Sequence, residues 1–236
     1  GSLAQRELGA DSLVVELASN DGYLLRNHVE AGVRVPEIDP AEGPARAARE
    51  VGVETLNDFF TRDLARRLVA DGKAADVIHA NNVLAHVADT NGFVAGMAEL
   101  LKNDGTIVVE APHVMELVER CEFDTMYHEH LCYFSVHSVD KLLRRHGLYL
   151  NRLQQLDIHG GSLRLFVEKH EAVESSVTDL EEQERQRGVH TESYYRTFGE
   201  RVQEVRTKLR VLLTQLHSQG KRIAAYGAAA KGTTLV

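Results

Sequence analysis

Along the first 110 residues, short apolar runs alternate with stretches in which apolar residues recur at helical spacing. The runs are nearly all apolar, which is typical of parallel strands buried on both faces. The expected strands are Leu13–Leu17, Val33–Ile38, Val53–Leu56, Asp76–Ala80 and Thr106–Glu110. The expected helices are Tyr23–Ala31, Ala41–Glu50, Phe60–Ala70 and Asn91–Leu101. Because strands that alternate with helices form βαβ units, the pattern predicts an α/β fold with a parallel sheet and helices on both faces.

The regular alternation of strands and helices ends after this first part of the chain. We expect a helix at Val114–Cys121, an aromatic and histidine-rich loop at Phe123–Phe134, and a helix at Ser138–His146 that ends before a glycine. Two more strands follow, at Tyr149–Leu156 and Ser162–Glu168. They bring the expected sheet to seven strands, most of them parallel.

The C-terminal part of the chain is charged and helical from Asp179 on. Between Tyr194 and Leu216 apolar residues step by three and four along one helix face, which we interpret as a packing surface. Arg222–Tyr226 is predicted to be a strand that enters the small-residue turn Gly227–Gly232. The expected parts are therefore a domain over 3–172, a helical extension over 173–220, and the start of a further α/β domain over 221–236. An exposed apolar helix face is compatible with a monomer or a homodimer.

Composition excludes several classes of function. The net charge is -8, so the chain lacks the basic surface that a nucleic-acid phosphate backbone requires. No apolar run has the length of a membrane span, and no signal-like stretch opens the chain. Cys121 and Cys132 lack metal-ligand spacing, so we expect a reduced cytoplasmic protein without a bound metal.

The first candidate site, Glu16–Gly22, lies between an expected strand and an expected helix. Its small residues allow a ligand to approach the backbone at the carboxyl end of the sheet, but the pattern is not G-x-G-x-x-G, which disfavours a dinucleotide. Asp39 after the second strand would bind ribose hydroxyls, and Asp58–Phe60 after the third would contact adenine. Read singly, these residues are also compatible with a turn and a helix cap. Their order after three successive strands favours an adenosine ligand. The candidate cofactor-binding residues are Glu16, Ala18, Ser19, Asn20, Asp21, Gly22, Asp39, Pro40, Asp58, Phe59, Phe60, Asn81 and Asn82.

Two further candidate sites contain histidines. His86 follows the fourth expected strand and is compatible with a pocket lining or with an ordinary polar loop residue. Tyr127–His130, with the sequence Tyr-His-Glu-His, lacks the one-turn spacing of a helical zinc motif. The combination of imidazole, carboxylate and phenol favours a general base, and the alternative is a surface loop with unrelated histidines.

A glycine pair precedes the last expected strand, in the segment His159–Arg164. The two glycines allow a tight turn, and Arg164 is able to pair with a phosphate or a carboxylate. The alternative is a glycine-rich hairpin with Arg164 on its solvent face.

Four segments together resemble one family: ELASNDGYLL at Glu16–Leu25, NNVLAH at Asn81–His86, EFDTMYHEH at Glu122–His130 and HGGSLR at His159–Arg164. The chain is similar to the S-adenosylmethionine-dependent C-methyltransferases that act on nucleotide-linked keto-deoxysugars. The resemblance implies the class I methyltransferase fold, S-adenosylmethionine as cofactor and a nucleotide-linked sugar as substrate. The N-terminal zinc module of that family has no counterpart in this sequence, and Tyr226–Lys231 resembles the opening of its C-terminal domain.

The resemblance also implies roles for individual residues. His130 would be the general base, with Tyr127, Glu129 and His86 as companions, in C-methylation at C3 of a 4-keto sugar through an enolate. The implied substrate-binding residues are His159, Gly160, Gly161 and Arg164. Val35–Ile38 departs from the smaller residues expected before Asp39, and without flanking domains we expect cofactor binding but poor turnover of the sugar. The alternatives are an O- or N-methyltransferase of a small metabolite and a non-catalytic adenosine-binding module; an NAD-dependent dehydrogenase is disfavoured by the glycine pattern.

Overall fold

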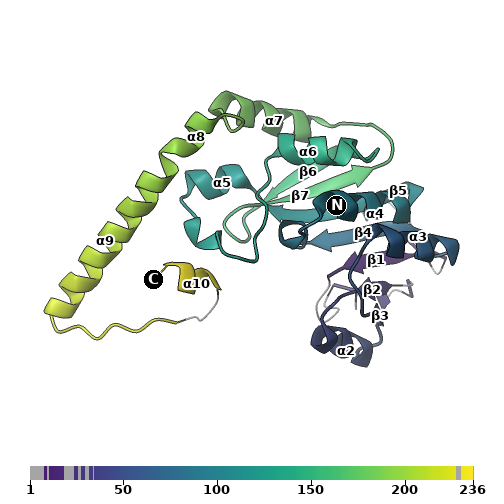
Figure 1. Ribbon diagram of the computed structural model, residues 1–236, viewed down its shortest axis with the longest axis horizontal. Coiled ribbons are helices and arrows are strands. Elements are labelled where there is room, and N and C mark those ends of the chain that lie inside the picture. The colour runs from purple at the N-terminus through teal and green to yellow at the C-terminus, as the bar shows by residue number, and fades with distance from the viewer. Residues whose placement is uncertain are drawn as a thin grey trace.

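The computed structural model describes residues 8–9, 11–18, 24–25, 28–29, 32–33, 35–226 and 230–235. Figure 1 shows a central sheet with helices on its faces and a long helix, α9, that extends away from this body. Most of the expected helix Tyr23–Ala31 lies outside the described residues, as do the candidate cofactor residues Ser19, Asn20, Asp21 and Gly22.

The sheet has seven strands in the order β3-β2-β1-β4-β5-β7-β6. The pairs from β3 to β5 are parallel, and β7 is antiparallel to both β5 and β6. The strands are β1 (Val14–Leu17), β2 (Pro36–Ile38), β3 (Glu54–Leu56), β4 (Ala75–Asn81), β5 (Leu101–Pro112), β6 (Tyr149–Leu156) and β7 (Ser162–Glu168). This confirms the predicted sheet of seven mostly parallel strands. The second strand is shorter than predicted, because it begins at Pro36. Proline lacks the N–H group that would continue the hydrogen bonds of a strand, and it is tolerated at the first residue.

Helices cover both faces of the sheet and divide its apolar side chains into two clusters. The larger cluster joins Val15, Ile78 and Ile107 of the sheet to buried residues of five α-helices. The smaller cluster lies on the other face and includes Val14 and Val77. The helices of the larger cluster are α3 (Arg62–Ala70), α4 (Thr90–Leu100), α5 (Val114–Glu119), α6 (Val136–Arg144) and α7 (Ser175–Arg187); the smaller cluster includes a residue of α2 (Glu42–Glu50). The short elements α5 (Val114–Glu119), η2 (Leu84–His86) and η3 (Phe123–Thr125) lie in the connections.

Three of these helices begin at residues that are typical N-caps. Thr61 accepts a hydrogen bond from the Leu64 N–H at the start of α3, and Asp89 accepts one from Gly92 N–H at the start of α4. Ser135 and Ser138 exchange side-chain and backbone hydrogen bonds at the start of α6. These caps satisfy N–H groups that the first turn of a helix leaves without partners. They explain why the helices begin within two residues of the predicted positions.

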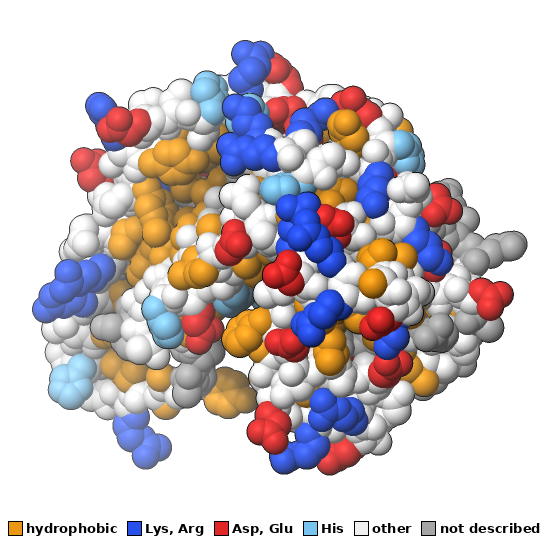
Figure 2. Space-filling view, turned by 45° about the vertical axis from the view of Figure 1, so that its right-hand side comes forward, with side chains coloured by type: hydrophobic (Ala, Val, Ile, Leu, Met, Phe, Trp, Pro, Cys, Tyr) orange, Lys and Arg blue, Asp and Glu red, His pale blue; other side chains and the backbone are white. Residues whose placement is uncertain are grey.

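The C-terminal helices α8 (Glu192–Arg196) and α9 (Phe198–Ser218) follow α7. The guanidinium of Arg201 donates hydrogen bonds to the backbone carbonyls of Val118 and Glu119, which fixes the start of α9 to the end of α5. Further along α9, two residues of the predicted apolar stripe are exposed, Val205 at 36% and Leu212 at 51%, whereas Val202, Leu209 and Leu216 are half-buried. Figure 2 shows a band of apolar side chains on the side of the molecule where Figure 1 draws α9. The apolar stripe expected to pack is thus only partly covered within the described part of the chain.

The predicted strand at Arg222–Tyr226 is wrong. These residues form no regular element and are all exposed, and the chain then continues into the helix α10 (Ala230–Leu235). A strand is stabilised by hydrogen bonds to a neighbouring strand, and no described strand lies beside this segment. In Figure 1 the chain turns back after α9, so that α10 lies below α5. Among the described helices, none combines the length and the apolar character that crossing a membrane requires.

Candidate functional site

A cavity of about 1040 Å³ opens at the carboxyl ends of the parallel strands. This edge is where open α/β sheets bind ligands. Eight of the predicted residues line the cavity, namely Glu16, Ala18, Pro40, Phe59, Phe60, Asn81, Asn82 and His86. The sequence patterns did not single out Thr61, Asp63 and Asp89, which also line it. These residues belong to helix starts, where Thr61 and Asp89 are N-caps and Asp63 lies in the first turn of α3.

The two predicted acidic contacts beyond β1 lie next to this cavity rather than in its wall. Asp39 is buried, and its Oδ1 accepts a hydrogen bond from the Ala41 N–H at 2.7 Å. Asp58 is exposed and lies 3.7 Å from the guanidinium of Arg67. The Asp39 side chain therefore stabilises the turn that precedes α2, although the N-cap residue of that helix is Ala41.

Three ionisable side chains occupy one row across the sheet, because Glu16 of β1 is paired with Glu37 of β2 and with His79 of β4. All three are at least 95% buried. Burial and the charge of Glu37 raise the pKa of Glu16 to about 8. Burial likewise lowers the pKa of His79 to about 4, with further contributions from His28 and Arg164. Within the described residues, the Glu16 Oε2 atom has no hydrogen-bond partner, so this carboxyl presents a free acceptor at the cavity.

Two cavity residues have a left-handed backbone conformation that residues other than glycine rarely adopt. Ala18 follows β1 with a φ of 57°, and Asn82 follows β4 with a φ of 53°. Backbone hydrogen bonds hold both, from Ala18 N–H to the Ile38 carbonyl and from Asn82 N–H to the Glu110 carbonyl, each at 2.8 Å. Such conformations cost free energy and are concentrated at ligand sites. Both lie at the strand ends that form the floor of the cavity.

One wall of the cavity is aromatic. Phe59 is 72% exposed, and Phe60 packs edge-on against Phe93 with ring centroids 5.3 Å apart. An exposed phenylalanine ring at the mouth of a cavity is suited to the flat face of a purine. Free acceptors, small residues and an aromatic wall together fit an adenosine ligand with an attached amino acid.

The histidine-rich loop is fastened beside this cavity. The backbone N–H of Leu131 donates a hydrogen bond of 2.8 Å to the carbonyl of Ala85, which ties the loop to η2. As a result the ring of His86 lies edge-on to that of His130, with centroids 4.8 Å apart. His86 thus lines the cavity and contacts the predicted base at the same time.

The hydrogen bonds of His130 determine which ring nitrogen carries the proton. Its Nδ1 lies 2.7 Å from the backbone oxygen of Thr125, which can only accept, so Nδ1 carries a hydrogen. In the neutral ring Nε2 is then unprotonated and accepts a hydrogen bond from the Tyr127 hydroxyl at 3.2 Å. Thr125 contributes through its backbone alone, so its side-chain identity gave no signal in the sequence.

Burial sets the protonation of both partners. It lowers the pKa of His130 below its ordinary value of 6.5, and the charges of His86 and Lys231 lower the pKa further. The Thr125 hydrogen bond and the charge of Glu129 act in the opposite direction. Burial, followed by the charge of Glu129, raises the pKa of Tyr127. A neutral imidazole therefore faces a protonated phenol near neutral pH.

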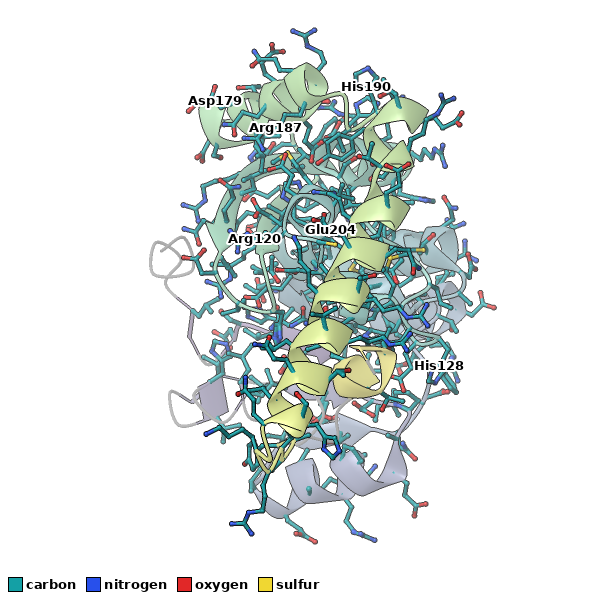
Figure 3. All side chains as sticks on the ribbon, turned by 90° about the vertical axis from the view of Figure 1, so that its left-hand side faces the viewer. Arg120, His128, Asp179, Arg187, His190 and Glu204 are labelled. Atoms are coloured by element: carbon teal, nitrogen blue, oxygen red, sulfur yellow. The ribbon has the colours of Figure 1, made fainter. Side chains whose placement is uncertain are left out.

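The other charged members of the loop point outward. The side chain of His128 is 86% exposed and that of Glu129 is 58% exposed, and they lie 3.7 Å from each other. In Figure 3 the labelled His128 lies at the edge of the molecule. The structure thus brings together His86, Tyr127 and His130, with Tyr133 at 6.3 Å from the His130 ring, whereas Glu129 acts on His130 only through its charge.

The glycine pair forms a tight loop over the end of α5. His159, Gly160 and Gly161 have φ values of 53°, 87° and 125°, and the Arg120 guanidinium donates to the Gly160 carbonyl at 3.2 Å. Arg164, which follows on β7, forms an ion pair with Glu110 of β5 in which the atoms are 2.5 Å apart. The carboxylate partner of Arg164 is therefore a residue of the protein itself. No group of three or more metal-binding side chains is found among the described residues.

Comparison with known families matches nearly the whole chain in two parts. Residues 3–153 match the family described as methyltransferase domain. The chain belongs to that family. Residues 157–236 match the C-methyltransferase C-terminal domain. The methyltransferase-domain match accounts for the cavity and its strands, and the second match begins in the loop that carries His159.

Two curated proteins are similar to this chain. It is 36% identical over 227 residues to C-methyltransferase NovU of Streptomyces niveus, a match that covers 95% of the chain and 54% of that protein. It is 27% identical over 97 residues to the ubiquinone biosynthesis O-methyltransferase of Bartonella quintana, with 41% of the chain and 39% of that protein covered. The chain spans about half the length of these relatives or less.

Solved structures share the fold of this chain at low sequence identity. Magnesium protoporphyrin IX methyltransferase of Synechocystis with bound SAH aligns with a TM-score of 0.55 and 17% identity, over 72% of this chain and 78% of that one. A TehB-like SAM-dependent methyltransferase of Corynebacterium glutamicum aligns with a TM-score of 0.53 and 15% identity, over 72% and 85%. These likenesses confirm the predicted class I methyltransferase fold.

Proposed function

We propose that this chain methylates a carbon next to a ketone, at C3 of a nucleotide-linked 4-keto-deoxysugar, with S-adenosylmethionine as the methyl donor. The observation that carries the proposal is the hydrogen bond from His130 Nδ1 to the Thr125 carbonyl, which places the hydrogen of the neutral ring on Nδ1. The opposite nitrogen, Nε2, is left as a base beside His86, which lines the cavity. A methyl transfer to oxygen or nitrogen has less need of a base that removes a carbon-bound proton.

The residues that would hold the cofactor are those of the cavity. Glu16 offers a buried acceptor to an ammonium group, and Phe59 offers an apolar face to adenine. Ala18 and Asn82 bring the backbone close to the ligand at the strand ends. When bound, S-adenosylmethionine supplies an electrophilic methyl group on a sulfonium sulfur.

His130 performs the first chemical step in this proposal. A ketone acidifies the hydrogen on the neighbouring carbon, so Nε2 takes that proton and the electron pair of the C–H bond forms an enolate. The hydroxyl of Tyr127, which donates to Nε2 before the reaction, turns to donate to the substrate oxygen. The new carbon–carbon bond would form with these electrons while the methyl–sulfur bond of the donor breaks and leaves S-adenosylhomocysteine, and the proton on His130 would later pass to solvent.

A hydrogen-exchange experiment tests the proposal. We expect deuterium from the solvent to enter C3 of a nucleotide-linked 4-keto sugar in the presence of S-adenosylhomocysteine, because proton removal does not require methyl transfer. His130→Asn should lower both exchange and methylation by roughly 10²–10⁴-fold while the affinity for S-adenosylhomocysteine is unchanged. His128→Asn is the matched control, since that side chain is exposed in the same loop. Methylation without any exchange would instead favour the O-methyltransferase alternative, to which the Bartonella quintana relative belongs by name.

A further inference from the structure

The helix α10 packs against η3, the same short element whose last residue fixes the predicted base. Thr125 ends η3 and accepts the Nδ1–H of His130. The chain turns back after α9 (Figure 1), and its C-terminal segment contacts η3, which holds His130 through Thr125. A segment that matches the C-terminal domain of C-methyltransferases thus contributes to the candidate active site.

Lys231 in this helix is half-buried. Among the described residues its ammonium group has no hydrogen bond and no ion pair within 4.0 Å. Glu122 is near enough for the charge of Lys231 to oppose the rise that burial causes in the pKa of its carboxyl. A partly buried cation without a close partner is costly, which indicates that another anion pairs with it in the working state of the site.

The position of this cation beside a base is informative. His130 becomes positively charged when it takes a proton, and a second positive charge nearby would hinder that step unless negative charge forms between them. In the proposed reaction, negative charge forms on the ketone oxygen of the substrate. This oxygen is attached to C4, the neighbour of the carbon that loses its proton. A cation at this position stabilises the charge at the moment when it appears.

Building on the proposed function, we infer that Lys231 is a catalytic residue that stabilises the enolate oxygen of the substrate. Its ammonium group and the hydroxyl of Tyr127 would be the two donors to that oxygen. The alternative anion is a phosphate of the nucleotide, which the same cation would bind without any role in proton removal.

The test compares three variants in the C3 hydrogen-exchange reaction with a nucleotide-linked 4-keto sugar. Lys231→Met should lower the exchange rate by about 10²–10³-fold, with the dissociation constant of the sugar nucleotide unchanged. Lys231→Arg retains the charge and should retain most of the exchange. Lys208→Met is the control, because Lys208 lies on the exposed side of α9 with its side chain 73% exposed. An unchanged exchange rate, or a loss of sugar-nucleotide affinity with an unchanged rate, would overturn the inference; the second result would assign Lys231 to a phosphate.

A second measurement does not depend on the substrate. We expect the pKa of His130, followed by NMR in the chain without ligands, to rise in Lys231→Met and to stay near the wild-type value in Lys231→Arg and Lys208→Met. An unchanged pKa in Lys231→Met would contradict the position of the lysine beside the base. If this pKa rises but the wild-type chain exchanges no C3 hydrogen, the proposed function fails and the placement of Lys231 stands.

Discussion

At the scale of single residues, the pKa of His130 sets the pH range in which the site is able to act. Because burial lowers the pKa of His130 below 6.5, the base form persists into mildly acidic solution. We therefore expect the rate of C3 exchange to fall only as the pH drops below that value. Tyr127→Phe removes the donor that stabilises the neutral ring, so the acid limb of the pH–rate profile should move to higher pH. A limb at the same pH in this variant would show that the phenol does not bind Nε2 in solution.

Glu16 gives a second prediction at this scale, concerning cofactor binding. Its pKa of about 8 means that the carboxyl of the empty site is protonated at pH 7. A bound ammonium group favours the ionised form, so binding of S-adenosylhomocysteine should release a proton and become tighter as the pH rises towards 8. Calorimetric titrations at pH 7 in two buffers with different ionisation enthalpies measure this proton. In Glu16→Gln the two buffers should give the same heat, and equal heats for the wild-type chain would contradict the prediction.

At the scale of elements, the glycine loop before β7 depends on backbone geometry that only glycine adopts freely. A Cβ atom at Gly161 would lie 2.8 Å from the Cβ of Glu116, and the residue has a φ of 125°. We expect Gly161→Ala to lower the free energy of unfolding by about 1–3 kcal/mol, as measured by denaturant titration. Gly43→Ala is the control, since its position in α2 has an ordinary φ and nothing within 4 Å. That variant should be neutral or more stable, because alanine is the better helix former; equal losses in both would contradict the strain argument.

The elements also mark where sequence reasoning succeeds. The positions of the strands follow from buried apolar runs such as those of β1 and β4, and the helix starts follow from caps such as Thr61 and Asp89. Arg222–Tyr226 is mostly apolar, as a strand would be, but has no neighbouring strand to pair with among the described residues, and local pattern carries no information about pairing. The row of Glu16, Glu37 and His79 was likewise not predictable from the sequence, because it depends on the register between three strands.

The candidate site was predictable where side chains carry the signal and unpredictable where backbone or distant contacts do. Tyr127 and His130 were recognised by their residue types, and the structure brings them together. The acceptor that fixes the tautomer is a backbone oxygen of Thr125, which any residue would supply. Lys231 reaches the same place only because the chain turns back after α9, more than 100 residues from His130 along the chain. A sequence pattern read locally is unable to report such an approach.

At the scale of the whole molecule, the ligand-free cavity contains several features that cost folding free energy. Ala18 and Asn82 adopt left-handed conformations, and the Glu16 Oε2 atom lacks a partner within the described residues. These costs sit at the carboxyl ends of β1 and β4, in the centre of the sheet. A ligand that satisfies the free groups therefore binds only the folded chain, and its binding energy adds to the stability of the entire sheet.

We thus expect S-adenosylhomocysteine to stabilise the fold as a whole. At a concentration 100 times its dissociation constant, it should add about 2.7 kcal/mol to the free energy of unfolding. For a chain of this length, that corresponds to a rise in Tm of roughly 5–10 °C in a thermal melt. NAD at the same concentration should leave Tm unchanged, because the loop after β1 lacks the glycine pattern of a dinucleotide site. Glu16→Gln should reduce the rise, since the cavity then loses its carboxylate; a Tm raised by NAD alone would overturn the assignment of the cavity to an adenosylated amino acid.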